Sequence, residues 1–155
     1  MRAIATVLLV LMAATAGLCQ ADEAPADGTA EAEDLMVLLR AVWPGGDLEN
    51  TSFRVFKDRN MRELVELYPA PDGTAMAVLP AGEYYVMAVV DANGNNQVDA
   101  GDGFGFHGVS DLSADSAPAP VTVAPEQLNS ATIPILMKRS EDGRLVPLPA
   151  ALQGT

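Results

Sequence analysis

The residues at positions 84–90, Tyr-Tyr-Val-Met-Ala-Val-Val, constrain the fold more than any other segment of the chain. In an extended strand successive side chains point to opposite faces, so Tyr84 and Val90 share one face, and Tyr85 and Val89 share the other. Both faces are therefore apolar. Such a strand has to be covered on both sides, which predicts a central position in a layered β-structure.

Other segments of alternating or β-branched residues are separated by clusters of Gly, Pro, Asn and Asp, which favour turns. We expect strands within residues 35–43, 52–57, 62–68, 74–79, 103–108, 121–123, 130–137 and 144–148. With 84–90 these are nine candidate segments, of which we expect about seven to be strands. Together with the absence of a long helical pattern they predict an all-β fold, an antiparallel β-sandwich.

Two of these segments are ambiguous. Residues 35–43 fit a strand with Leu35 and Trp43 on one face, but they also fit a short helix, because short apolar runs satisfy both periods. Residues 62–68 show the same ambiguity. For this second segment, the turn around Asp72 favours a strand that pairs with 74–79 as a hairpin.

An oxygen-rich loop at residues 91–102, Asp-Ala-Asn-Gly-Asn-Asn-Gln-Val-Asp-Ala-Gly-Asp, follows the central strand. Oxygen-bearing side chains occupy loop positions 1, 3, 5, 9 and 12, and position 7 would supply its backbone carbonyl. The candidate metal ligands are Asp91, Asn93, Asn95, Gln97, Asp99 and Asp102. Ca²⁺ takes six to eight oxygen ligands, so the spacing predicts a calcium site. Mg²⁺ fits less well, because it demands a tighter octahedral shell and retains its waters.

The alternative for this loop is a polar hairpin without metal. The Asn93-Gly94 pair favours a tight turn, and Asp and Asn side chains cap turns unaided. A turn, however, does not require oxygens at five matched positions or a carboxylate as far along as Asp102. Three carboxylates brought close together would also repel one another unless a cation neutralised them.

The loop resembles the calcium loops of dockerins and EF-hands at the six candidate ligands. It departs from them at position 6, where Asn96 replaces the usual Gly, and Asn is the next most tolerant residue for a left-handed backbone. Position 12 is Asp102, where EF-hands carry Glu. The chain has one such loop, whereas dockerins have two with helices, so the resemblance is to the loop and not to the dockerin fold.

A second resemblance covers residues 72–108. The sequence Leu-Pro-Ala-Gly-Glu-Tyr at 79–84, followed by the loop and by Gly-Phe-Gly-Phe at 103–106, is similar to bacterial exported domains with a transthyretin-like sandwich, such as carboxypeptidase regulatory-like domains. The resemblance implies a fold with Tyr84 packed inside. It implies little about activity.

The N-terminus has the pattern of a secretory signal peptide over residues 1–21, with Arg2 ahead of an uncharged apolar run. We expect cleavage before Asp22 and a secreted or periplasmic protein. Cleavage before Gly17 is the alternative, and lipid attachment at Cys19 matches the lipoprotein pattern poorly. An acidic, disordered tether (22–34), the sandwich domain (35–150) and a short tail (151–155) complete the predicted organisation.

The formal net charge of −12 disfavours nucleic acid and anionic membranes as partners, because both would repel the chain. It is compatible with cation binding. The sequence contains no pattern typical of membrane insertion beyond the apolar leader.

No catalytic constellation emerges from the sequence. His107 is the only histidine, and a triad with its neighbours Ser110 and Asp111 is disfavoured, because triad members seldom lie so close in sequence. We therefore predict a non-catalytic exported protein in which calcium is a structural staple. The alternatives are a calcium-dependent adhesion module for a protein or carbohydrate partner and a metal-free sandwich. Exposure of Tyr85, Phe104 and Phe106 in one patch would favour adhesion.

Overall fold

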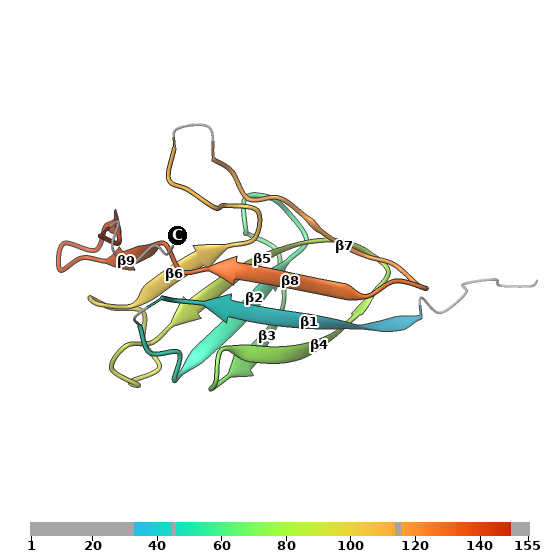
Figure 1. Cartoon of the computed structure of the whole chain (residues 1–155), viewed down its shortest axis with the longest axis horizontal. Helices are drawn as coiled ribbons and strands as arrows, with labels where there is room; N and C mark the ends of the chain where they lie inside the picture. The colour runs from blue at the N-terminus through green and yellow to red at the C-terminus, as the bar shows by residue number, and fades with distance from the viewer. Residues whose placement is uncertain (1–32, 45, 114–115, 150–155) are drawn as a thin grey trace, which may run out of the picture. The chain divides into compact units, whose positions relative to one another are not determined.

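The computed structural model describes residues 33–44, 46–113 and 116–149 (Figure 1). The predicted signal peptide, most of the predicted tether (22–32) and the C-terminal tail fall outside these residues. Regular structure begins at Asp34, one residue before the expected start of the domain.

The described residues form strands and no helix. The ten strands are β1 (Asp34–Val42), β2 (Thr51–Phe56), β3 (Leu64–Ala70), β4 (Thr74–Pro80), β5 (Gly82–Val90), β6 (Gly103–Phe106), β7 (Val121–Val123), β8 (Asn129–Pro134), β9 (Met137–Arg139) and β10 (Leu145–Pro147). The all-β prediction is confirmed. The strand number exceeds the expected seven, partly because the predicted 130–137 segment divides into β8 and β9, which join different sheets.

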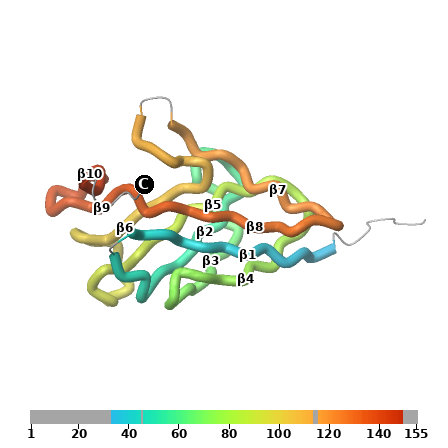
Figure 2. The backbone as a smooth tube through the Cα atoms, viewed as in Figure 1, coloured from blue at the N-terminus to red at the C-terminus, as the bar shows by residue number. Residues whose placement is uncertain are grey.

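Two sheets pack as a β-sandwich. One has the strand order β4-β1-β8, and the other has the order β10-β9-β6-β5-β2-β3, with β7 paired to β5. The smaller sheet lies in front of β5, β2 and β3 in Figures 1 and 2. The prediction of a sandwich is correct, but its pairing is not wholly antiparallel, because β1 and β8 run parallel.

The central-strand prediction for residues 84–90 is confirmed. β5 pairs with both β2 and β6, and its first residues also pair with β7. Tyr84 is 2% exposed and its hydroxyl donates to the carbonyl of Pro80 at 2.9 Å, so this tyrosine is a core residue with a satisfied polar end.

The core lies between the sheets and is built from alternate residues of facing strands. β1 is a strand and not a helix, with Val37, Leu39 and Ala41 buried on one face. Trp43 continues that face and packs against the core. Full burial of a Val, Leu or Ile side chain contributes about 1.5–3 kcal/mol, so this interface dominates the stability of the domain.

The predicted hairpin of β3 and β4 is wrong, although both strands exist. β3 pairs with β2 at the edge of the larger sheet, and β4 pairs with β1 in the smaller one. The tight turn at residues 71–73 therefore carries the chain from one sheet to the other. The physical reason is burial, because β4 places Ala77 and Leu79 in the core only from the opposite sheet.

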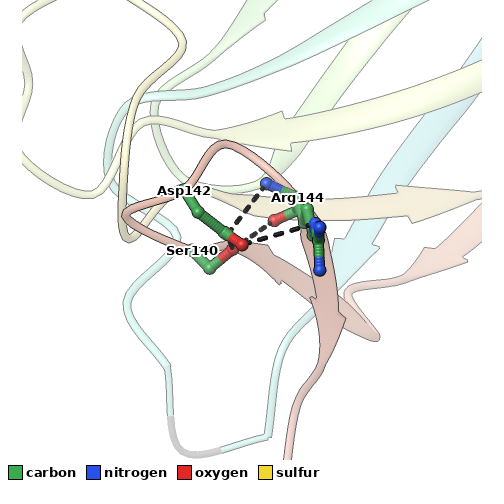
Figure 3. A network of polar contacts seen from close by, with 3 residues as sticks. All are labelled: Ser140, Asp142 and Arg144. Atoms are coloured by element: carbon green, nitrogen blue, oxygen red, sulfur yellow. Dashed lines mark hydrogen bonds and ion pairs between the residues drawn. The ribbon is translucent and has the colours of Figure 1, made fainter.

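β9 and β10 form the hairpin expected from the 140–143 turn. Figure 3 shows its polar contacts: the Ser140 hydroxyl donates to the Asp142 carboxylate, and Arg144 Nε lies 3.3 Å from Asp142 Oδ2. The Ser140 hydrogen bond, followed by one from the Arg144 backbone, lowers the pKa of Asp142. Both charged side chains are largely exposed, so this ion pair adds little stability.

Candidate functional site

The oxygen-rich loop joins β5 to β6, which are antiparallel neighbours whose last paired residues are Val90 and Gly103. The connection is therefore the whole segment 91–102 and not a two-residue turn at Asn93-Gly94. At its start the Asp91 N–H donates to the Asn50 carbonyl at 3.3 Å. At its end the Gly101 N–H donates to the Arg139 carbonyl at 2.8 Å, and the Arg139 N–H donates to the Asp102 carbonyl at 2.8 Å. Both ends of the loop are thus held by the sandwich.

Asp91, at loop position 1, organises the first half of the loop. Its Oδ1 accepts the Gly94 N–H at 2.8 Å and its Oδ2 accepts the Asn96 N–H at 2.6 Å. Gly94 and Asn96 have φ values of 71° and 60°, in the left-handed region. The backbone at position 6 therefore has the conformation expected of the Gly in a calcium loop, with Asn96 supplying it.

Asn93, Asn95 and Asp99 converge inside the curl. The side-chain amide of Asn93 donates to the two carboxylate oxygens of Asp99 at 3.1 and 3.2 Å, and that of Asn95 donates at 2.7 Å. The Asn amide oxygens accept backbone N–H groups two residues on, from Asn95 and Gln97. Loop positions 3, 5 and 9 thus already face a common point.

Asp102 is the only charged residue among the described residues that is buried, and its exposed fraction is 0%. Its Oδ1 accepts the Ala92 N–H at 3.0 Å, and its Oδ2 accepts the Asp99 N–H at 2.8 Å. No lysine, arginine or histidine of the described residues pairs with it. Each oxygen retains a further lone pair, so the carboxylate can still ligate a cation.

The candidate ligands are not all gathered in one place. In the part of the chain that is described, no three His, Cys, Asp or Glu side chains lie close enough to hold a metal, so Asp91, Asp99 and Asp102 do not form a compact triplet. The side chains of Asn93 and Asn95 are both hydrogen-bonded to that of Asp99. Gln97 has an exposed side chain, and its carbonyl accepts no hydrogen bond among the described residues.

Comparison of the chain with known protein families, with characterised proteins and with solved structures gives no match in any of the three. The function of the loop therefore has to be inferred from this chain's own residues. Among the described residues no helix is long and apolar enough to cross a membrane.

The surroundings of the only histidine do not form a hydrolytic triad. His107 Nδ1 lies 3.0 Å from the Ala119 carbonyl. Asp111 instead accepts hydrogen bonds from Ser116 and Ser113, which lower its pKa to about 2. Over the described ranges, no hydrogen bond joins His107 to Ser110 or Asp111.

The aromatic residues beside the loop are largely withdrawn from solvent. Phe104 is 5% exposed, and Tyr85 and Phe106 are half-buried. These three residues do not form the exposed patch that would favour a stacking partner. Trp43 is partly buried and packs against the core.

Three residues that border the loop or its cavity, Asn50, Arg139 and Arg54, were not identified from the sequence. Asn50 and Arg139 clamp the two ends of the loop, and Arg54 of β2 lines the same cavity as Asn96 and Gln97. The only sequence signal for Arg54 is a cation between the apolar residues Phe53 and Val55 of a predicted strand. Asn50 carries no signal beyond its place in a turn.

Proposed function

We propose that the 91–102 loop binds one Ca²⁺ and that the ion acts as a structural staple in an exported, non-catalytic β-sandwich. The observation that supports this most is the Asp102 carboxylate, which is fully buried, accepts two backbone N–H groups and has no cationic side chain as a partner among the described residues. An ionised carboxylate is costly to bury unless a counter-charge offsets it. A divalent cation would supply that charge.

The proposed ligand set is the one the spacing predicts. Carboxylate oxygens would come from Asp91, Asp99 and Asp102, with the Gln97 backbone carbonyl between them. Because these three carboxylates do not lie together in the described structure, the loop would have to close around the ion. Asn93 and Asn95 direct their NH₂ groups at Asp99 in the structure. A half-turn of each amide would direct its oxygen inward, where a cation would replace the two N–H donors as the partner of Asp99.

A metal here would act on stability more than on chemistry. The loop joins β5 to β6 and is attached to Asn50 before β2 and to Arg139 on β9, so a bound ion would tie these parts of the larger sheet together. Export would support the proposal, since EF-hand-type sites of extracellular modules are tuned to roughly 10⁻⁴–10⁻³ M Ca²⁺. The partner proposed on these grounds is the calcium ion, with no nucleic acid and no membrane insertion.

Calcium should raise the thermal unfolding midpoint of the protein. At a free concentration about a hundredfold above Kd, binding to the native state alone adds about 2.7 kcal/mol, which corresponds to roughly 10 °C for a domain of this size. The measurement is circular dichroism melting in EGTA, in CaCl₂ and in MgCl₂ at equal ionic strength. MgCl₂ is expected to give a much smaller rise than CaCl₂.

Identical midpoints in EGTA and CaCl₂ would contradict the proposal and leave the loop as a polar hairpin. A rise that CaCl₂ and MgCl₂ produce equally would also contradict it, because such a rise would reflect general screening of an acidic chain.

A further inference from the structure

A cavity of about 340 Å³ lies on the outer face of the larger sheet, between β2, β3 and the 91–102 loop. This volume is within the range of small-molecule sites. Leu67 and Pro69 of β3 form one wall, Val89 of β5 lies at the base, and Val98 of the loop covers another side. The cavity thus has an apolar side, formed by Leu67, Pro69, Val89 and Val98, and a polar side, formed mainly by Arg54, Asn96 and Gln97.

Arg54 contributes the one positive charge of this cavity. It lies in the middle of β2, with Leu67 of β3 and Met87 of β5 as its cross-strand neighbours. Its side chain makes no hydrogen bond and no ion pair among the described residues. Nε is buried without an acceptor, whereas the terminal Nη groups are not buried.

An arginine without a carboxylate partner is unusual in so acidic a chain. Aspartate and glutamate outnumber lysine and arginine by 21 to 9, so carboxylate partners are abundant. Asp91 is the one acid among the residues that line the cavity, and its two oxygens accept the Gly94 and Asn96 N–H groups and no hydrogen bond from Arg54. The guanidinium thus retains its capacity for two parallel hydrogen bonds to one carboxylate.

We propose that this cavity binds a small molecule that carries a carboxylate on an apolar body. The carboxylate pairs with the Nη groups of Arg54, and the apolar body lies against Leu67, Pro69 and Val98. The side-chain amides of Asn96 and Gln97, at the loop side of the cavity, supply further hydrogen-bond donors and acceptors.

The site does not depend on the metal. The wall that the loop contributes is held by the hydrogen bonds of Asp91 and by the Gln97 N–H, which donates to Asn95. Ligand binding is therefore expected in EGTA, where the loop keeps these hydrogen bonds. A failure of the calcium proposal would leave this inference intact, and the reverse also holds.

The test is a titration of the ¹⁵N-labelled protein, followed by NMR, with N-acetyl-L-leucine as the probe. Saturable shifts with a Kd on the order of millimolar are expected in β2, β3 and residues 96–98. N-acetyl-L-leucinamide, which has the same body without the charge, should bind at least tenfold more weakly. D-galacturonate, a carboxylate on a polar body, should also bind more weakly.

Arg54→Gln should weaken the binding of N-acetyl-L-leucine at least tenfold. Arg40→Gln, at an exposed position of β1 in the other sheet, should leave the binding unchanged. If the melting midpoint of Arg54→Gln equals that of the native protein, the loss of binding is not caused by unfolding. If that midpoint falls, the acid-versus-amide comparison on the native protein decides the matter. Equal binding of acid and amide, shifts confined to other surfaces, or no saturable shift at 20-fold the expected Kd would overturn the proposal.

Discussion

Asp102→Ala is expected to lower the free energy of unfolding by about 2–4 kcal/mol and to abolish the stabilisation by calcium. The substitution removes the only acceptor of the Ala92 and Asp99 N–H groups, and an unsatisfied buried donor costs about 1–3 kcal/mol. It also leaves a small void at a fully buried position. Urea unfolding in EGTA measures the first effect, and the same experiment in CaCl₂ measures the second.

Asp102→Asn separates the two contributions. Asn has the shape of Asp and keeps one acceptor oxygen but lacks the charge, so the loss in EGTA should be smaller than for alanine while the calcium effect should still disappear. Asp34→Ala, at the exposed start of β1, is the matched control and should change neither quantity. A loss below about 1 kcal/mol for Asp102→Ala would contradict the account of this carboxylate as a structural anchor.

Gly105→Ala is expected to destabilise the protein by about 3 kcal/mol or more, or to prevent folding. A Cβ at this position would lie 2.1 Å from the Pro134 carbonyl oxygen and 2.8 Å from the Pro134 carbonyl carbon. Both are backbone atoms of β8, so relief requires the two sheets to move apart. Overpacking of this kind costs 1–3 kcal/mol even where side chains can adjust.

Urea unfolding of Gly105→Ala tests this expectation. Ser130→Ala, a substitution at an exposed position of β8, should stay within about 0.5 kcal/mol of the native protein. A Gly105→Ala protein of native stability would mean that β6 and β8 do not approach as closely as described.

The local sequence pattern predicted those strands whose position in the fold follows from which of their own side chains are apolar. Strand β5 is apolar on both faces and occupies the middle of its sheet. The Gly-Phe alternation of β6 also has a simple cause in the structure: Gly103 and Gly105 face closely packed neighbours, including Ile135 and the Pro134 carbonyl, where a larger side chain would collide.

Sheet membership could not be predicted in the same way. The turn at residues 71–73 is as short as a hairpin turn, but it passes between sheets, and turn chemistry alone does not distinguish the two. The parallel pairing of β1 with β8 joins segments about ninety residues apart. Such pairings depend on the packing of the whole core and leave no local trace.

The same division holds for the loop. The spacing of its oxygens predicted Asp91 and Asp102 as metal ligands, which stays a prediction. In the structure each accepts backbone N–H groups and so organises part of the loop. The clamps at Asn50 and Arg139, and the neighbouring Arg54 cavity, arise from strands distant in sequence. Only the folded chain brings them beside the loop.

Isothermal titration calorimetry of the metal-free protein with CaCl₂ tests the central claim most directly. We expect a single saturable transition with a stoichiometry near one, much weaker binding of MgCl₂, and no transition for Asp102→Asn. The absence of a saturable heat at millimolar calcium, or equal binding by Asp102→Asn, would contradict the assignment of the 91–102 loop as a calcium site.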